Sequence, residues 1–562
     1  MAYKRLGDVL LAAGAISEED LNKALGLQKG TDHRLGTVLI ESGIITERQL
    51  IEALEMQLGV DFIDLSKTTI DPEMAKYIPK NVAKKHNIVP VRVDRDQLYI
   101  AMSDPLNFVA MEDAKKVSGK RIVPMIATAE AVDRSIITLY GNEGAARAID
   151  EMRKSNLTST EGVTPTSVET DDDANAAPTI RLVNSIIERA VTERASDIHL
   201  ESRENDMLVR LRVDGMLRNV LTVPKELENS VISRLKVMGQ MDTSERRVPQ
   251  DGRANVRSKG KDIDLRISTL PTIFGEKVVL RLLDKSVQFL TREGIGLDGE
   301  SNQQLDTLMR NNTGVFLITG PTGSGKSSTM SMMVRELNKP EVNIVTLEDP
   351  VEYNIDGVNQ VQINEKTGMT FASGLRSILR QDPDIISVGE IRDGETADIA
   401  MRAAITGHLV LSTIHTNDSV STLDRLNDIG VEPYLTASAM KGVISQRLVR
   451  KICPDCREEY HPTEDELEFL GLDSGTDMKF YKGKGCPNCF HTGYKGRTGV
   501  FEILLVNAEM RRAIGRRAPQ EEIYEIARRN GFHTLRERCL EKVKAGVTTV
   551  EEALRTINSA EE

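Results

Sequence analysis

The chain has 562 residues, of which 40% are hydrophobic and 28% charged, and its net charge is −12. One hydrophobic core does not serve a chain of this length, so we expect three or four domains of soluble globular composition. The acid excess and the absence of Trp argue against general nucleic-acid binding, which relies on basic surfaces and aromatic stacking. No apolar run approaches the ~18 residues that span a bilayer, and the start of the chain lacks a signal-peptide pattern, so we expect a cytoplasmic protein.

An internal repeat opens the chain. Residues 5–28 recur as residues 34–57 at a constant offset, and each copy has the pattern of two short helices. Ser17 and Thr46 stand at equivalent positions, each followed by acidic residues, and are expected to cap the second helix of each copy.

Composition then divides the rest of the chain. Short apolar runs at residues 87–91 and 97–101 indicate paired strands of a small α/β part, and residues 155–178 have the Ser, Thr and Asp content of a linker. Alternating runs follow, among them residues 208–213 before an Asp-Gly turn. We therefore expect an N-terminal domain at 1–145, a flexible linker at 146–178, an α+β domain at 179–290, an α/β domain at 291–505 with a cysteine-rich insertion at 450–495, and a helical region at 506–562.

A phosphate-binding loop is the most specific local signal. The apolar strand run at residues 315–319 precedes Gly320-Pro321-Thr322-Gly323-Ser324-Gly325-Lys326-Ser327-Ser328, which opens a helical stretch. This is G-x-x-x-x-G-K-[ST] in its strand–loop–helix context. In such a loop the backbone N–H groups face the phosphates, Lys326 reaches the β and γ phosphates, and the Ser327 hydroxyl ligates Mg²⁺. An ordinary Gly-rich turn is the alternative, and the preceding strand disfavours it.

Two further apolar runs end in carboxylates. Residues 344–348 end at Glu348, and residues 384–388 are followed by Gly389 and Glu390. The carboxyl end of a strand beside a phosphate loop is where Mg²⁺ and the attacking water need such groups. Because Gly389 takes the position of the usual Walker B Asp, Glu390 is the natural water-activating base, with Glu348 as its competitor or helper. Structural ion pairs are the alternative for both.

A fourth run carries His408 at one end and His415 at the other. A single His is usually a structural residue with its hydrogen bonds satisfied. A pair that flanks a core strand can instead sense the γ-phosphate and relay its loss.

Four of the five cysteines stand in two pairs. Cys453 and Cys456 form one C-x-x-C knuckle, and Cys486 and Cys489 form the other. Four thiolates at this spacing can close a tetrahedral, structural zinc site. Free buried thiols or redox pairs are the alternatives, and Cys539 has no partner in the pattern.

The nucleotide motifs resemble those of the assembly ATPases of type II secretion and type IV pili. The phosphate loop, Glu348-Asp349-Pro350, Gly389-Glu390 and the His408–His415 segment match that family's four motifs in order and spacing. The resemblance implies a RecA-like P-loop core preceded by an α+β (PAS-like) domain. It implies a homo-hexamer in which ATP at subunit boundaries drives an inner-membrane platform protein. Membrane association then runs through partners, on the cytoplasmic face, with no direct nucleic-acid contact.

The same resemblance extends to three sets of residues. It places His415 at the nucleotide, and it implies that arginines before the core reach the nucleotide, with Arg210, Arg212, Arg266 and Arg281 as candidates. Charged residues on the outer face of a strand are the alternative for these four. The family's assembly members carry the cysteine insertion, whereas its retraction members lack it.

The N-terminal repeat is similar to the cyclic di-GMP-binding domain of some pilus and secretion ATPases. Paired arginines can hold phosphates or stack on guanine, and repeated glycines permit close backbone approach. Packing alone or partner docking is the alternative. The candidate ligand residues are Arg5, Leu6, Gly7, Leu10, Gly14 and Gln28, with Arg34, Leu35, Gly36, Leu39, Gly43 and Gln57 in the second copy.

The leading functional hypothesis is an ATP-hydrolysing motor for pilus assembly, regulated by cyclic di-GMP. The same engine in type II secretion is the first alternative, and a nucleic-acid translocase is less favoured. A non-hydrolysing signalling scaffold is hardest to reconcile with intact Lys326, Ser327 and Glu390.

Overall fold

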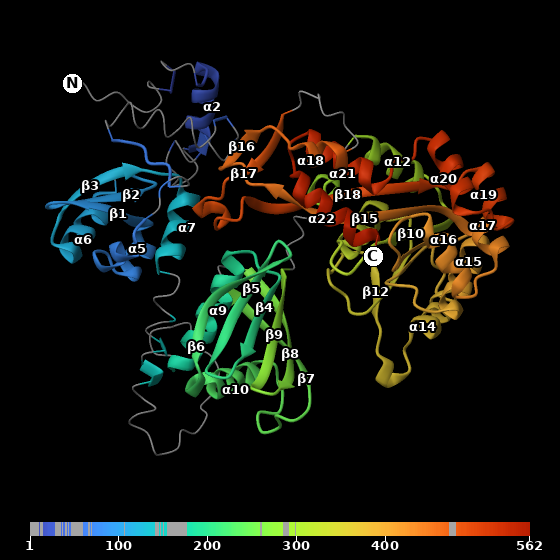
Figure 1. Cartoon of the computed structure of the whole chain (residues 1–562), viewed down its shortest axis with the longest axis horizontal. Coiled ribbons are helices and arrows are strands. Elements are labelled where there is room, and N and C mark those ends of the chain that lie inside the picture. The colour runs from blue at the N-terminus through green and yellow to red at the C-terminus, as the bar shows by residue number, and fades with distance from the viewer. Residues whose placement is uncertain are drawn as a thin grey trace. The chain divides into compact units, whose positions relative to one another are not determined.

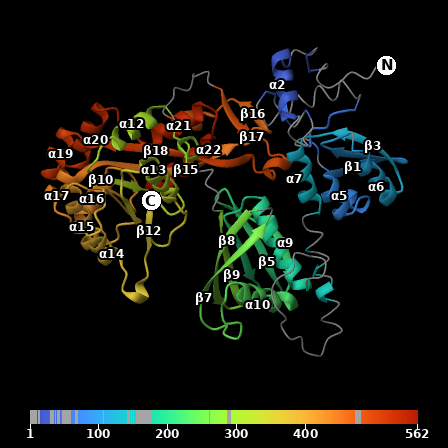
Figure 2. The same cartoon turned by 180° about the vertical axis from the view of Figure 1, so that it is seen from behind.

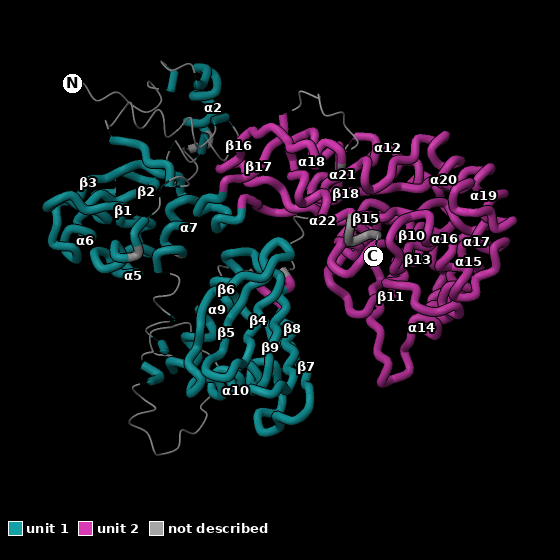
Figure 3. The backbone as a smooth tube through the Cα atoms, viewed as in Figure 1, with its two compact units in different colours: residues 1–260, 265–282, 485–492 teal, residues 261–264, 283–484, 493–562 magenta. Residues whose placement is uncertain are grey.

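The structure of the chain is a computed structural model. It describes residues 10–11, 15–28, 35, 38–39, 42, 44–45, 60–65, 68, 70–105, 107–140, 145, 148–149, 151–153, 177–258, 261–284, 291–297, 299–470 and 479–561. These residues form two compact units, one with residues 1–260, 265–282 and 485–492 and the other with residues 261–264, 283–484 and 493–562 (Figure 3). Within the described ranges no helix is both long and apolar enough to cross a membrane.

The described part of the N-terminal repeat has equivalent backbone geometry in its two copies. The N–H of Ala15 donates to the Leu10 carbonyl at 3.0 Å, and the N–H of Ile44 donates to the Leu39 carbonyl at 3.0 Å. Leu10 and Leu39 are both fully buried in one small apolar cluster. Ser17 caps helix α2 (Glu18–Gln28) by accepting from the N–H of Asp20, as expected, whereas Thr46 lies outside the described residues.

A small α/β body follows the repeat. The expected strand pair is confirmed, because β1 and β2 are antiparallel and β3 joins β2 in parallel. Tyr140 is fully buried and its hydroxyl donates to the Ile78 carbonyl at 2.6 Å, which ties the last helix to the core. The elements are η1 (Pro72–Lys76), α5 (Lys80–His86), β1 (Ile88–Asp94), β2 (Gln97–Met102), α6 (Phe108–Ser118), β3 (Arg121–Ile126) and α7 (Ala129–Tyr140).

The next body is a six-stranded sheet in the order β6-β5-β4-β9-β8-β7. Successive side chains of each strand point to opposite faces of this sheet. On one face Leu200 and Leu280 pack against Val183 of α9 and Leu235 of α10, and the other face carries charged side chains. The elements are α9 (Pro178–Thr192), β4 (Asp197–Ser202), β5 (Asp206–Val213), β6 (Met216–Pro224), η2 (Lys225–Leu227), α10 (Glu228–Met238), β7 (Gln250–Ser258), β8 (Lys261–Thr272) and β9 (Gly275–Asp284).

The second unit is built on a seven-stranded sheet in the order β12-β11-β13-β14-β10-β15-β18. Figure 1 labels β12, β10, β15 and β18 of this sheet. All its neighbouring strands are parallel except β15 and β18. Its strands are β10 (Gly314–Thr319), β11 (Ile344–Glu348), β12 (Asn359–Gln362), β13 (Ile385–Val388), β14 (Leu409–Ile414), β15 (Met440–Ile452) and β18 (Tyr494–Leu505).

Helices cover both faces of this sheet. Along β10, Val315 and Leu317 enter the core shared with α14 to α17, α19 and α20, while Phe316 and Ile318 enter the core shared with α11 to α13. Continuous apolar runs are therefore required of these strands. Figure 2 labels α14 to α17, α19 and α20 of the first group and α12 and α13 of the second. The helices are α11 (Arg292–Ile295), α12 (Gly299–Met309), α13 (Lys326–Leu337), η4 (Glu365–Thr367), α14 (Phe371–Ile378), α15 (Gly394–Ile405), α16 (Ser421–Asp428), α17 (Pro433–Ala439), α19 (Ala508–Gly515), α20 (Gln520–Arg529), α21 (Leu535–Lys544) and α22 (Val550–Glu561).

The cysteine-rich insertion lies between β15 and β18. Its strands β16 (Arg457–Tyr460) and β17 (Phe480–Gly483) pair antiparallel. The remaining elements are α18 (Glu464–Phe469) and η5 (Pro487–Cys489).

Candidate functional site: a phosphate loop at the edge of the parallel sheet

The phosphate loop joins the end of β10 to the start of α13. Gly325 is the N-cap of α13 at φ 92°, and a Cβ on it would lie 2.8 Å from Nε2 of Gln446. Gly320 has φ 143°, and a Cβ there would lie 2.5 Å from the Gln446 carbonyl. Both positions therefore require glycine, and the helix N-terminus with its unpaired N–H groups forms an anion-binding concavity.

Lys326 folds back over this loop. Its Nζ donates to the Gly320 carbonyl at 2.7 Å and to the Pro321 carbonyl at 3.2 Å. Burial lowers the pKa of Lys326, and the charge of Glu390 opposes that shift. Lys326 and Glu390 therefore share one electrostatic environment.

Glu390 and His415 also lie together. Glu390 follows β13 and His415 follows β14, and these parallel strands end at the same edge as β10. Nε2 of His415 lies 3.4 Å from Oε2 of Glu390, and Oε1 of Glu390 forms an ion pair with Arg392. Burial lowers the pKa of His415, and the charge of Lys326 adds to the shift.

Glu348 has different surroundings. Its Oε1 accepts from Thr346 Oγ1 at 2.6 Å and from Gln360 Nε2 at 2.9 Å. Glu348 therefore has neutral hydrogen-bond donors, whereas Glu390 has cationic and titratable partners.

The two histidines separate. His408 precedes β14 and its Nδ1 lies 2.9 Å from the Ala403 carbonyl, so its ring is held at the end of α15. His415 follows the same strand at its carboxyl end, beside Glu390. Only His415 of the pair belongs to the edge that carries the phosphate loop.

Sequence reasoning missed the side chain that braces the loop. Gln446 of β15 is 2% exposed, donates to the Ser324 carbonyl at 2.8 Å, and accepts from Thr329 Oγ1 at 2.7 Å. Its neighbour Arg447 is also buried and donates to the Asn417 carbonyl. The sequence did contain a signal for these residues. Two polar side chains stand inside the apolar run of β15, and buried polar side chains require hydrogen-bond partners.

The four candidate arginines of the six-stranded sheet divide into two kinds. Arg210 donates to Glu201 at 2.6 Å, and Arg212 lies 3.7 Å from Asp197 and donates to the Gly215 carbonyl. Arg266 and Arg281 instead line a cavity of about 420 Å³, although Arg281 also donates to Asp197. The other residues that line it are Asp251, Gly252, Arg253, Ile267, Ser268 and Val279.

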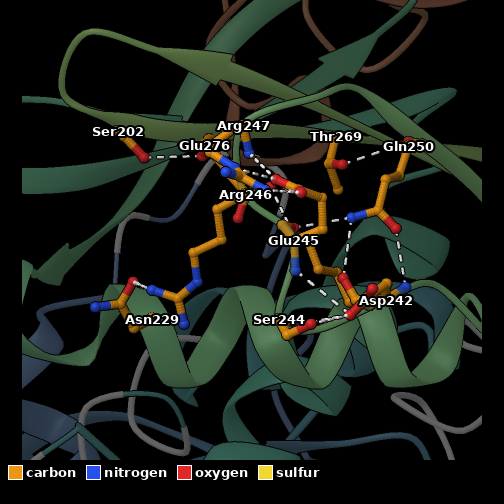
Figure 4. A network of polar contacts seen from close by, with 11 residues as sticks. Ser202, Asn229, Asp242, Ser244, Glu245, Arg246, Arg247, Gln250, Thr269 and Glu276 are labelled. Carbon is orange, nitrogen blue, oxygen red and sulfur yellow. Dashed lines mark hydrogen bonds and ion pairs between the residues drawn. The ribbon is translucent and has the colours of Figure 1, made fainter.

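Arg253 is the member of this group that the sequence analysis missed. It lies on β7, whose first residue, Gln250, is held by the loop before it (Figure 4). Gln250 Nε2 donates to the carbonyls of Asp242 and Glu245 at 2.9 Å each, and Lys236 Nζ donates to the Glu245 carbonyl at 2.6 Å. The network fixes where β7 begins and thereby the position of Arg253.

The four paired cysteines converge as the spacing predicts. The Sγ atoms of Cys453, Cys456, Cys486 and Cys489 all lie within 4.8 Å of one another, and three of the four residues are buried. The Sγ atoms of Cys486 and Cys489 are 3.7 Å apart. Sulfurs around a tetrahedral Zn²⁺ with Zn–S near 2.3 Å are about 3.8 Å apart, so the donor set fits zinc.

Of the residues predicted to bind cyclic di-GMP, Leu10, Gln28, Leu35 and Leu39 fall within the described ranges. Leu10 and Leu39 are buried in the repeat's own core. The rest lie outside the described residues: Arg5, Leu6, Gly7, Gly14, Arg34, Gly36, Gly43 and Gln57.

A phosphate loop on a parallel sheet, with a carboxylate at the end of a neighbouring strand, defines a P-loop NTPase. Residues 172–555 match the family model described as "Type II/IV secretion system protein", and residues 58–146 match the MshEN domain model. The chain belongs to the type II/IV secretion system protein family and is an ATPase.

Individual relatives agree with this assignment. The type IV pilus assembly ATPase PilB of Myxococcus xanthus is 40% identical, with 98% of each chain covered. The type II secretion system protein E of Pseudomonas aeruginosa is 41% identical over 85% of this chain and 95% of its own length. PilB of Thermus thermophilus is 43% identical over 88% of this chain, which spans only 56% of that relative. The structure of the Legionella pneumophila ATPase DotB matches 71% of this chain and 100% of its own with a TM-score of 0.50 at 20% identity, and shows the same fold.

Proposed function

We propose that this chain is the ATP-hydrolysing motor of type IV pilus assembly, acting as a homo-hexamer on an inner-membrane platform protein from the cytoplasmic side. The observation that carries the proposal is the convergence of Lys326, Glu390 and His415 at the edge where the phosphate loop begins. The PilB relative that matches this chain end to end supports pilus assembly over other uses of the same engine.

In this proposal each residue of the edge has a defined role in ATP hydrolysis. The loop from Gly320 to Ser328 surrounds the phosphates with N–H groups, and Lys326 exchanges its two carbonyl contacts for phosphate oxygens. The Ser327 hydroxyl would hold Mg²⁺, which would supply positive charge to the phosphates. Glu390 accepts a proton from the attacking water, and His415 sets the orientation of Glu390 and senses the γ-phosphate.

We propose that the arginines acting on a neighbour's nucleotide are Arg253, Arg266 and Arg281. Their common cavity, of about 420 Å³, has room for a phosphate chain. Arg210 and Arg212 do not line this cavity, and each lies against a carboxylate of β4, where cross-strand ion pairs stabilise the sheet. Arg281 also pairs with Asp197 of β4, but it lines the cavity. Three guanidinium groups around one cavity supply the charge that a phosphoryl transition state requires.

The cysteine cluster is proposed to hold a structural Zn²⁺. All four ligands come from the protein, so no position is open for water or substrate. The ion would fix the two knuckles at the base of the insertion.

Cyclic di-GMP is proposed to bind the N-terminal domain and regulate the motor. The tandem repeat, with equivalent backbone bonds in both copies, suits a two-fold symmetric ligand, and the MshEN match follows it directly in the chain. Titration of the full chain with cyclic di-GMP should saturate, and Arg34→Ala should weaken binding. No binding by the full chain would leave the repeat a packing unit.

Type II secretion is the second candidate, because a relative of that system also matches most of this chain. A nucleic-acid translocase is disfavoured by the net charge of −12. Nucleic-acid-stimulated ATP hydrolysis with steep salt dependence would support the translocase and count against both motors.

Glu390→Gln tests the engine itself. The amide cannot accept the proton of the attacking water, so we expect ATP to bind with near wild-type affinity while hydrolysis slows by about 100-fold or more. Glu348→Gln is the matched control, with a smaller loss of kcat expected. A Glu390→Gln variant that hydrolyses ATP at the wild-type rate would refute the assignment.

A further inference from the structure

A buried carboxylate lies behind the ATP site on β18. Glu502 is 2% exposed and accepts three hydrogen bonds. The N–H and hydroxyl of Ser419 donate to its Oε1 at 2.8 and 2.5 Å, and the N–H of Leu535 donates to its Oε2 at 2.9 Å. One side chain thus joins the segment that follows β14 to the first residue of α21.

The segment that Glu502 holds is also the one that carries His415. At its start, His415 lies 3.4 Å from Glu390. The next residue, Thr416, donates its N–H to Thr319 Oγ1 at 2.9 Å, and Thr319 immediately precedes the phosphate loop. Residues 415–419 therefore have the proposed base at one end, the phosphate loop beside them, and Glu502 at the other end.

A carboxylate is the side chain that this position needs. Three donors converge on it, and an ionised carboxylate accepts through both oxygens while offering no hydrogen of its own. The N–H of Leu535 is one of the helix-terminal N–H groups that have no partner within α21, and a negative charge at a helix N-terminus is favourable. Burial raises the pKa of Glu502, and the hydrogen bonds from Ser419 and Leu535 oppose that shift.

We propose that Glu502 is a positioning residue for ATP hydrolysis. Its side chain connects the 415–419 segment to α21 and so couples the position of His415 to the C-terminal helices. The inference rests on the proposed ATP site. A shift of the segment when the γ-phosphate leaves would displace the N-terminus of α21 through two hydrogen-bonded steps, from Ser419 to Glu502 and from Glu502 to Leu535. The same link holds His415 beside Glu390 between turnovers.

Glu552 provides a matched control. It is fully buried, and it accepts from the N–H of Arg450 at 3.0 Å and from the Arg450 guanidinium at 2.7 Å. Like Glu502 it fastens a C-terminal helix to the central sheet, but it binds Arg450 of β15 and Arg555 of α22 instead of the 415–419 segment. Losing it should therefore destabilise the same region without disturbing His415.

The central variant is Glu502→Gln in the full chain. Glutamine has nearly the same shape, but it offers one oxygen and one NH₂ group, so that either Ser419 or Leu535 must face a donor. We expect kcat for ATP to fall about tenfold with KM changed less than about twofold, because positioning acts on the transition state. Ser419→Ala, which removes only the hydroxyl, should lower kcat about threefold, and Glu502→Asp should restore part of the loss.

Hydrogen exchange supplies a readout that does not depend on turnover. Adding a non-hydrolysable ATP analogue should change the protection of residues 530–545 in the wild type and in Glu552→Gln, and Glu502→Gln should abolish that response. Three results would each overturn the inference. They are a wild-type kcat in Glu502→Gln, an equal loss of kcat in a Glu552→Gln variant of the same Tm, and an analogue-induced change in α21 protection that Glu502→Gln leaves intact. If Glu390→Gln and His415→Asn also leave kcat unchanged, the proposed ATP site fails instead.

Discussion

Replacing Gln446 by Leu tests how the phosphate loop is held. The side chain makes two hydrogen bonds inside the core, one to the Ser324 carbonyl and one from the Thr329 hydroxyl. Leu has similar volume but makes neither bond, so both partners lose theirs, and Thr329 is only 1% exposed. A buried polar group without a partner costs about 1–3 kcal/mol, so with two such groups local stability should fall by about 2–6 kcal/mol.

The same substitution should weaken nucleotide binding. The Ser324 carbonyl and the Gly325 N–H belong to one planar peptide and point in opposite directions. Gln446 holds the carbonyl, and it thereby fixes the direction of an N–H group of the phosphate loop. Without that bond the peptide can rotate, and we expect KM for ATP to rise about tenfold with a smaller change in kcat.

A double-mutant cycle separates the two bonds. Thr329→Val removes the hydroxyl, so in the Gln446→Leu background it relieves the unpaired group and should recover about 1–2 kcal/mol. The measurement is the opening free energy of β15 and α13 from native-state hydrogen exchange, with ATP KM determined in parallel. Strict additivity of the two substitutions, within about 0.5 kcal/mol, would refute the bonding scheme.

Three other changes test the remaining sites. The pKa of His415 lies below its ordinary value of 6.5, so the ring is uncharged near neutrality. We expect kcat to fall as the pH drops through this lowered pKa, because the protonated ring pairs with Glu390. His415→Asn should flatten this limb of the pH–rate profile. Gly325→Ala, whose Cβ would lie 2.8 Å from Gln446 Nε2 at φ 92°, should raise ATP KM about tenfold or more, and an unchanged KM would contradict the requirement for glycine. Cys489→Ser should lower bound zinc below about one ion per chain by elemental analysis and speed proteolysis within residues 453–489; unchanged zinc content would exclude the cluster as its site.

Local chemistry explains why part of the site could be predicted. The strand, glycines and helix of the phosphate loop are contiguous, so residues 315–328 contain both the pattern and its context. Glu390 and His415 could be found because the carboxyl ends of parallel strands meet at one edge, wherever those strands stand in the order of the sheet. The cysteine knuckles likewise carry their own geometry.

Other parts of the site depend on sheet order and register, which a single sequence does not reveal. Gln446 comes to the phosphate loop because β15 is the neighbour of β10, and Glu502 reaches Ser419 because β18 lies next to β15. The choice among the arginines depended on the sheet as well, since register sets both Arg212 and Arg281 opposite Asp197, and only Arg281 of the two lines the cavity. Arg253 carries no local pattern, and only the neighbouring strands bring it into the cavity with Arg266.

The position of these buried polar groups also constrains how the ATP site can act on the rest of its unit. The two cores on either face of the sheet are apolar, and apolar contacts are non-directional, so a small shift of the 415–419 segment can be absorbed by sliding. A hydrogen bond in the core does not allow such sliding, because its strength falls steeply as its angle departs from linear. Its donor and acceptor also have no water to replace the lost partner. Any displacement of Ser419 must therefore move Glu502 or break a bond whose loss is costly. The bonds of Glu502 thus give motion at the strand edge a route to α21 with a defined direction.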